Sequence, residues 1–509
     1  MKKIALVTFF TLFFAAGTGH VALADIGEAG FFGGITDGST LPKMTDIKAK
    51  TEKKRRTRAY KEVVFVSGEP VTFEGVIAVD AKNQPVEFTE PAGAYAVTFT
   101  VAPGDGADAD GVVSINRAVT FDVRYRKEGR QVIKDYEPRT WSETIVTPAG
   151  EFSLDPVHSR FNVSVIEDHA PGVVYYKGDI SQRRVYNDAE NKITALDSSG
   201  AFYGYSCALS AAEAHRIDIT AISDGFQAQY QVRPAISSVK ILRYGENEPD
   251  AISFSGNYRE ITQSSSGLEY NIYEKPQYID VPTFGREYMP VYNSFEQLIS
   301  PDLGFLKGHF AEEAITKLFA TQVFENDPLF FKPAQVMTRG QFISAVARAI
   351  KLRLPDLTPK KGRSKKSAVI DDTDAAFGDA APDRPDYGYI MAANAAGLIF
   401  GRDNGSYYPD NAITREEAAV IIMRALGLES ISPDAASDTP FADGSQISDW
   451  ARRSMNAARF IGILNGDGFA RPDETLSKAD AALLLNAMTD YMRYGLSRDY
   501  TEHIVNYAD

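Results

Sequence analysis

Residues 409–426 read PDNAITREEAAVIIMRAL, and this stretch determines how the C-terminal part of the chain is interpreted. The same pattern returns at 333–349 (PAQVMTRGQFISAVARA) and at 472–488 (PDETLSKADAALLLNAM). In every copy a cation stands six residues after the proline, namely Arg339, Arg415 and Lys478. A unit that recurs with fixed internal spacing indicates a repeated supersecondary element.

Each copy carries the signature of a helix start. A hydroxyl residue at the N-cap is followed three residues later by an amide or an acid: Thr338 with Gln341, Thr414 with Glu417, and Ser477 with Asp480. This spacing predicts a capping box, with Asp480, the shorter acid, expected to close it less well. Apolar residues then recur at steps of three and four, which predicts a helix with one buried face.

The cation is the part of the pattern that capping does not explain. A Lys or Arg in the first turn meets the positive end of the helix dipole, which costs roughly 0.3–1 kcal/mol when exposed. Beside open backbone N–H groups, however, a cation suits an anion site. The alternative is that each cation pairs with a local carboxylate or points to solvent. Three copies at one spacing favour the anion site.

A helical segment precedes each cap, at 308–323, 387–401 and 449–468. Glycines near the end of the last two suit a helix C-cap and turn. Each unit is therefore predicted to be a helix, a glycine- and proline-containing loop, and a capped helix.

Residues ~300–495 resemble three tandem S-layer homology modules. The matching motifs are His309–Ala311, Asp449–Ala451, Phe377–Asp379, Phe441–Asp443 and Tyr407–Pro409, together with the Thr-Arg caps. No copy keeps the whole Thr-Arg-Ala-Glu pattern of that family. The first copy has Phe310 in place of the usual Trp and ends in Gly-Gln, and the third has Ser-Lys and Asp.

The resemblance implies an all-α bundle of three modules in a pseudo-threefold arrangement, at 299–355, 372–430 and 438–496, with a basic loop inserted at 356–371. In the family such modules bind a secondary cell-wall polysaccharide, often one that carries pyruvate ketals, in grooves between modules. Carried over to this chain, the binding residues are Arg339, Arg415, Lys478, Thr338, Thr414, Ser477, Trp450 and Phe310.

The chain ends agree with an exported protein. Residues 1–24 have the charged start, apolar run and small-residue cleavage site of a signal peptide, and no later stretch predicts a membrane-spanning helix. Residues 25–59 are expected to be a basic linker, and 497–509 a C-terminal tail. The net charge of −14 argues against nucleic-acid binding. We expect a secreted protein of the cell wall or cell surface.

Residues 60–290 contain β-branched and aromatic runs separated by Gly, Pro and Asp clusters. Five of the clearest lie at 63–66, 71–73, 97–101, 119–123 and 161–165. This spacing predicts a β-rich region of one or two sandwich domains that projects outward as a structural or adhesive part.

Little in this region predicts chemistry. The single cysteine, Cys207, is expected to be buried and inert, and no metalloprotease, nucleophile-elbow or phosphate-loop motif occurs. Asp105, Asp108 and Asp110 resemble part of a calcium loop but lack its twelfth-position acid, so an acidic turn is the alternative, and no cofactor is expected. The primary hypothesis is a non-enzymatic anchor. A wall-anchored polysaccharide hydrolase with its site in 60–290, and a protein that self-associates into a surface layer, are the alternatives.

Overall fold

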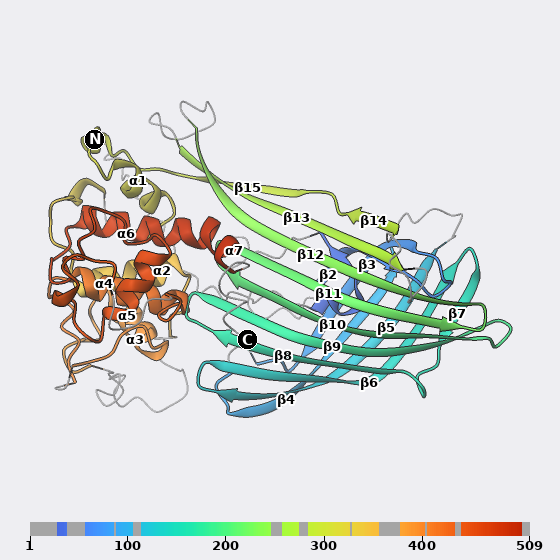
Figure 1. Ribbon diagram of the computed structural model, residues 1–509. Coiled ribbons are helices and arrows are strands. Elements are labelled where there is room, and N and C mark those ends of the chain that lie inside the picture. The colour runs from blue at the N-terminus through green and yellow to red at the C-terminus, as the bar shows by residue number, and fades with distance from the viewer. Residues whose placement is uncertain are drawn as a thin grey trace, which may run out of the picture.

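A computed structural model describes residues 28–37, 56–85, 88–104, 113–245, 257–273, 283–325, 328–355, 377–402, 405–432 and 439–500. The N-terminal part is a β-sheet of long strands, and the C-terminal part is a group of helices at one end of that sheet (Figure 1). This division into a β-rich region followed by a helical region confirms the coarse prediction.

The strands form one antiparallel sheet in which most strands pair with their neighbours in sequence. The exceptions are β7 and β8, which both pair with β6 and β9, and β15, which pairs with residues 258–264 of β13, whereas β14 pairs with residues 267–272 of that strand. The strands are β1 (Ile35–Thr36), β2 (Arg56–Val64), β3 (Val71–Lys82), β4 (Ala92–Pro103), β5 (Ser114–Glu128), β6 (Gln131–Thr147), β7 (Gly150–Leu154), β8 (Arg160–His169), β9 (Val173–Asp188), β10 (Ile193–Cys207), β11 (Ser210–Ser223), β12 (Phe226–Gly245), β13 (Asn257–Tyr273), β14 (Thr283–Tyr288) and β15 (Tyr292–Leu298).

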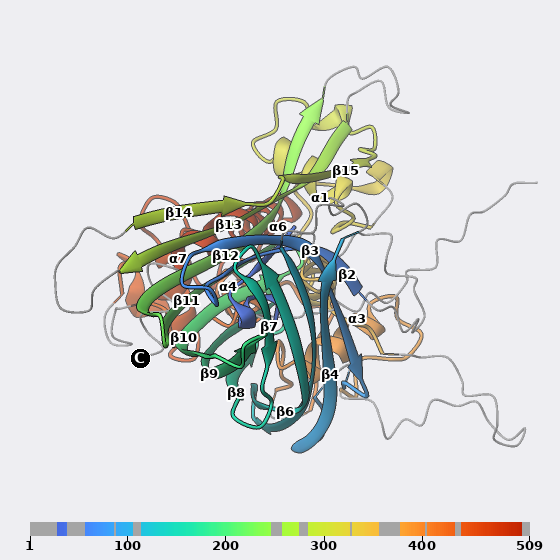
Figure 2. The same ribbon diagram turned by 90° about the vertical axis from the view of Figure 1, so that its right-hand side faces the viewer.

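A single sheet replaces the sandwich that the sequence predicted. Figure 2 shows that the sheet is strongly curved. Side chains on its concave face therefore pack against one another, where a sandwich would have a second sheet. Side chains alternate along β5 and β8, where Phe121, Val123, Phe161 and Val163 are buried and the intervening residues face outward. Alternation therefore identified the strands, but a sandwich and a curved sheet have the same alternation.

The concave face is filled by a segment that the sequence had placed in a linker. Residues 28–37 form η1 (Glu28–Phe32) and β1, with Phe31 and Phe32 buried against rings from four strands. A Cβ on Gly30 would lie 2.2 Å from Nε2 of His215, so glycine is required for this close approach. The prediction that 25–59 is a linker is therefore wrong for residues 28–37. Phe31 and Phe32 are apolar and the glycines beside them are small, so this segment packs inside the sheet.

The C-terminal part contains short helices joined by loops. They are η3 (Gly304–Leu306), α1 (Glu312–Ala320), η4 (Pro328–Phe330), α2 (Arg339–Ala349), α3 (Tyr387–Ala395), α4 (Arg415–Leu426), η6 (Gly444–Gln446), α5 (Arg452–Phe460), α6 (Lys478–Asp490), the π-helical turn η7 (Tyr491–Gly495) and α7 (Leu496–Asp499). Within the described residues, none of these helices combines the length and the hydrophobicity needed to cross a membrane.

One hydrophobic core runs from the helices into the ends of β9, β10 and β11. At this contact Gly172 donates its N–H to the carbonyl of Ala425 at 2.8 Å, and the Tyr175 hydroxyl donates to the carbonyl of Leu426 at 2.8 Å. Tyr500 stacks on Tyr175 with ring centroids 6.1 Å apart. Residues 497–500 are therefore helical or packed on the sheet, which corrects the predicted tail as far as the structure describes it.

Candidate functional site: the junctions between helical units

Three of the helices begin one residue after the predicted caps, and all three capping boxes are confirmed. The cap oxygens accept the N–H of Gln341, Glu417 and Asp480 at 3.2, 3.4 and 3.1 Å. The side chains of those residues accept the cap N–H groups at 3.3, 3.2 and 3.3 Å. The shorter Asp480 closes its box as well as the other two, so the expectation of a weaker box was wrong.

The N–H groups of the first two residues of each capped helix also have acceptors, which are carbonyls from the loop of another unit. The pairs are Arg339 to Asn411 and Gly340 to Pro409, Arg415 to Glu474 and Glu416 to Pro472, and Lys478 to Gln335 and Ala479 to Pro333, at 2.8–3.1 Å. These donors are therefore not open to a ligand. The predicted help from helix N–H groups is wrong, because each proline loop lies directly on the helix start beside it.

The three loops are joined to one another in a closed ring of backbone hydrogen bonds. Met337 donates to Leu476 at 2.9 Å, Leu476 to Ile413 at 3.0 Å, and Ile413 to Met337 at 3.0 Å. The helices follow the same order, since α2 packs on α3, α4 on α5, and α6 on α1. We call the α2–α3 contact, where Arg339 lies, junction 1–2. The α4–α5 contact with Arg415 is junction 2–3, and the α6–α1 contact with Lys478 is junction 3–1.

At junction 1–2 the cation is neutralised by the protein itself. The Arg339 guanidinium forms an ion pair with the carboxylate of Glu417 and donates from Nε to the carbonyl of Tyr407 at 3.0 Å. It also lies 4.6 Å over the Tyr407 ring, and only 10 % of its side chain is exposed. Nearby, Arg384 bridges Asp386 and Asp410 at 2.8–3.0 Å. The sequence left open whether each cation binds an external anion or pairs with a carboxylate of the protein. Arg339 pairs with a carboxylate of the protein.

At junction 2–3 the cation has no such partner. No carboxylate in the described residues lies within ion-pair distance of Arg415, and its buried Nε has no hydrogen-bond acceptor there. Burial lowers the pKa of the Arg415 guanidinium, and the nearby charge of Arg471 lowers it further, while the carboxylates of Glu474, Asp480 and Asp467 act in the opposite sense. The residue that corresponds to Tyr407 is Ala470, so the ring that covers Arg339 has no counterpart at this position.

At junction 3–1 the cation has polar and aromatic contacts, as Arg339 has, but within the described residues it has no carboxylate partner. The Lys478 ammonium donates to the side-chain oxygen of Gln335 at 2.8 Å and lies 5.6 Å from the centre of the Phe331 ring. Within the described residues it has no ion pair, and burial lowers the pKa of its ammonium group. A neutral amide and a ring leave the charge uncompensated.

Exposed aromatic residues precede two of the three helices that pack on the capped helices. Trp450 is 55 % exposed just before α5, and Phe310 is 68 % exposed just before α1, whereas Pro385 has the same place before α3. The Glu416 carboxylate accepts from Ser448 N–H at 3.1 Å and from its hydroxyl at 2.9 Å. This contact holds the segment that carries Trp450 beside the N-terminus of α4.

Sequence reasoning used two acids only as family markers and missed their structural role. Asp379 accepts the N–H groups of Tyr407 and Tyr408 at 2.9 and 2.7 Å. Asp443 accepts those of Ala470 and Arg471 at 2.6 and 2.8 Å. The two aspartates therefore hold the loops on which the junctions depend. Their shared Phe-x-Asp spacing was the available signal.

The sheet interior holds two carboxylates near each other, as a glycosidase site would. Arg117 donates to Glu62 at 2.7 Å and to Glu143 at 2.6 Å, and all three side chains are at most 1 % exposed. Burial alone would raise the pKa of Glu143, but Arg117 and Arg184 lower it below its ordinary value. A general acid needs the opposite shift, so this ion cluster gives no support to the hydrolase alternative.

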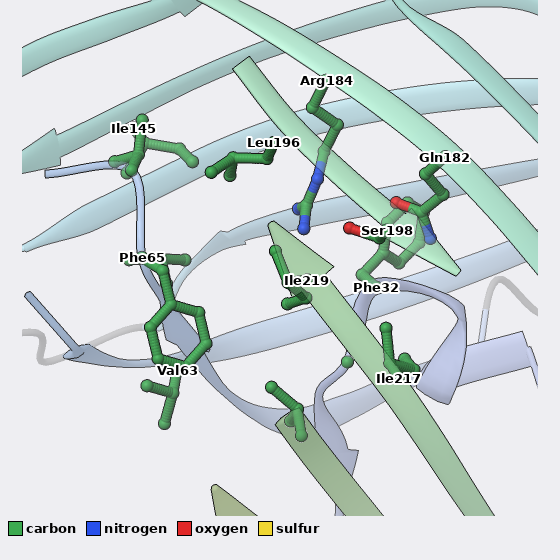
Figure 3. A pocket seen from close by; sticks show the side chains of 14 residues that line it. Phe32, Val63, Phe65, Ile145, Gln182, Arg184, Leu196, Ser198, Ile217 and Ile219 are labelled. Atoms are coloured by element: carbon green, nitrogen blue, oxygen red, sulfur yellow. The ribbon is translucent and has the colours of Figure 1, made fainter. Parts of the chain in front are cut away.

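A cavity beside this cluster is lined mainly by apolar side chains, with Arg184, Gln182 and Ser198 pointing toward one another (Figure 3). Arg184 Nε, Gln182 Oε1 and Ser198 Oγ lack hydrogen-bond partners among the described residues. The cavity measures about 10 Å³, which is room for about one water molecule. It is too small for a sugar ring.

The remaining sequence predictions concern other parts of the chain. Cys207 is buried, as expected. Across the described ranges no three His, Cys, Asp or Glu side chains are grouped as metal ligands. The calcium candidates Asp105, Asp108 and Asp110, the signal peptide 1–24 and the basic loop 356–371 lie outside the described residues.

Comparison with known families identifies the helical units. The model of the S-layer homology domain matches residues 306–343 and 376–419, which include α1, the start of α2, α3 and the start of α4. The chain carries S-layer homology modules. The two matches cover the first two units, and both include the capped helix start with its cation. The third unit lies outside them.

Curated relatives of the modules are larger proteins. An amylopullulanase of Thermoanaerobacterium thermosulfurigenes is 26 % identical over 41 % of this chain and 10 % of its own length. The exoglucanase XynX of Acetivibrio thermocellus is 26 % identical over 36 % of this chain and 16 % of its own. A surface layer protein of Brevibacillus choshinensis is 32 % identical over 23 % and 10 %. The chain thus spans less than a fifth of each of these relatives.

Proposed function

We propose that this chain is a cell-surface protein held non-covalently to the cell wall by S-layer homology modules. The third unit acts as a further module, and the three form a pseudo-threefold bundle. The closed ring of loop hydrogen bonds and the cyclic packing of α2 on α3, α4 on α5 and α6 on α1 support this arrangement. The ligand is an anionic, pyruvylated secondary wall polysaccharide, and the curved sheet projects outward as a structural or adhesive part.

The observation that carries this proposal is the environment of Arg415. Within the described residues the partly buried Arg415 guanidinium forms no ion pair and its Nε lacks an acceptor, which is costly for the folded protein alone. A ligand carboxylate would supply the missing partner through charge-assisted hydrogen bonds. The exposed ring of Trp450, on the segment that Glu416 holds at the N-terminus of α4, offers a flat apolar surface for the sugar that carries the carboxylate.

The test is co-sedimentation of the full-length protein with purified wall sacculi. Arg415→Ala should weaken binding about 10- to 100-fold, because it removes a charge-assisted contact of about 1.5–3 kcal/mol. Arg126→Ala is the matched control, since it removes an exposed cation from the outer surface of the sheet. Equal binding by the wild type and both variants would remove Arg415 from the site.

The two alternative functions, a surface-layer lattice and a hydrolase, make different demands on the protein. A surface-layer lattice is compatible with wall anchoring, and electron microscopy of the purified mature chain tests it. A hydrolase function would require an accessible pair of carboxylates with separated pKa values. The buried pair Glu62 and Glu143 does not provide one.

A further inference from the structure

We propose that Glu417 is a built-in carboxylate ligand of Arg339 that closes junction 1–2, so that the chain binds acidic sugars only at junctions 2–3 and 3–1. This inference rests on the proposed function, because it assigns which of the three junctions take the anionic ligand. It follows from the chemistry of one position, the third residue of each capped helix.

At junction 1–2 the position that an acidic ligand would take is already filled. The Glu417 carboxylate contacts the Arg339 guanidinium, whose Nε is bound to the Tyr407 carbonyl and whose face lies on the Tyr407 ring. Glu417 also accepts the N–H of Thr414 at 3.2 Å. A ligand carboxylate would have to displace Oε1 of Glu417 from Arg339, while the bond from Thr414 to Oε2 keeps this carboxylate in place.

The other two junctions lack this internal carboxylate. The residue that corresponds to Glu417 at junction 2–3 is Asp480, which is one methylene shorter and whose Oδ2 is bound to the hydroxyl and N–H of Ser477. It forms no ion pair with Arg415 within the described part of the chain. At junction 3–1 the corresponding residue is Gln341, which carries no charge to offer Lys478.

The aromatic residues follow the same division. Junctions 2–3 and 3–1 have the exposed Trp450 and Phe310 at the start of the neighbouring helix, and junction 1–2 has Pro385. An exposed aromatic residue thus accompanies the two cations that form no ion pair in the described residues. At junction 1–2 it is absent from the corresponding position, and Glu417 pairs with Arg339 and also lies 3.8 Å from the exposed Arg402. A packing requirement alone would not couple a change of acid in one helix to a change of ring in another.

The experiment counts ligands by isothermal titration calorimetry of the full-length protein. The probe is a methyl glycoside of one 4,6-pyruvylated N-acetylhexosamine, which carries a single carboxylate. The wild type should bind two molecules. Glu417→Gln should bind three, because it frees Arg339 while Gln341 shows that a glutamine can still complete the capping box. Gln341→Glu is the matched reverse variant and should bind one, because it supplies Lys478 with an internal carboxylate.

Three probe molecules on the wild type, or two on Glu417→Gln with an unchanged thermal melt, would overturn the inference and leave the wall-binding proposal intact. No binding by the wild type or either variant would reject the wall-binding proposal itself, and the inference with it. A melt of Glu417→Gln that matches the wild type shows that the variant is folded.

Discussion

At the residue scale, three cations at one repeated position have three different environments. The difference arises from the capped helix next in the ring, which offers a glutamate to Arg339, a shorter aspartate to Arg415 and a glutamine to Lys478. One methylene or one charge therefore decides whether a cation is a structural partner or a candidate ligand-binding group. Sequence reasoning found the position of the cations, but not this difference.

Lys478 leads to a prediction about pH. Burial lowers the pKa of its ammonium group below the ordinary 10.5, and a bound carboxylate raises it again. Because only the charged form attracts the ligand, affinity at junction 3–1 should fall as pH rises through the lowered pKa. Arg415 remains charged, so the calorimetric site number should fall from two toward one as the pH rises from neutral toward the ordinary value of 10.5.

Lys478→Arg is the control for this titration. An arginine at this position stays charged over the same range, so its site number should remain two. A site number that falls equally in the wild type and in Lys478→Arg would show that another group titrates.

At the element scale, each capped helix is completed by a loop from the next unit. The periodicity and caps within 409–426 were sufficient to predict the helix and its first residue. The bond from Arg415 N–H to the Glu474 carbonyl joins residues far apart in sequence, and no local pattern encodes it. The same limit applies to the sheet, where strands were predicted but their joining into one curved layer was not.

The two loop-holding aspartates give a prediction at this scale. Asp443→Ala removes two hydrogen bonds from the loop at 470–471, which should lower the free energy of unfolding by about 1–3 kcal/mol. It should also weaken probe binding, because the same loop lies on the helix start at junction 2–3. Asp379→Ala loosens the corresponding loop at junction 1–2 and serves as the comparison.

Both variants should melt at a lower temperature, but only Asp443→Ala should lose probe affinity, since junction 1–2 binds no probe. Equal loss of affinity in the two variants would contradict the assignment of an open junction 2–3 and a closed junction 1–2. Differential scanning calorimetry and titration calorimetry on the same samples separate stability from binding.

At the scale of the whole molecule, the sheet and the modules share one hydrophobic core. Tyr175 and Gly172 from the sheet bond to the last turn of α4, and Tyr500 packs between the two parts. The sheet is therefore expected to keep a fixed orientation when the modules bind the wall. The sequence suggested separate domains, because a contact made by glycine and tyrosine leaves no distinctive pattern.

Gly427 tests this contact. It has φ of 70°, and a Cβ there would lie 2.6 Å from the Cβ of Ala170 in the turn between β8 and β9. Gly427→Val should therefore cost roughly 2–4 kcal/mol of unfolding free energy, from backbone strain and from the clash across the contact. Gly397→Val is the matched control, with φ of 73° and no atom within 4 Å of the added Cβ.

Thermal unfolding should show a larger loss for Gly427→Val than for Gly397→Val, with the sheet and the helices melting separately in the former. Equal losses and one shared transition in both variants would mean that the contact contributes little to the coupling of the two parts.

Above all we propose that Arg415, which forms no ion pair within the described residues, holds an anionic wall polysaccharide. The most direct measurement is co-sedimentation of wild type and Arg415→Ala with intact sacculi and with sacculi stripped of that polysaccharide. The account predicts that the wild type binds intact sacculi at least about tenfold more tightly than the variant, and that neither binds stripped sacculi. Equal binding of the two proteins to intact sacculi, or retained binding to stripped sacculi, would contradict it.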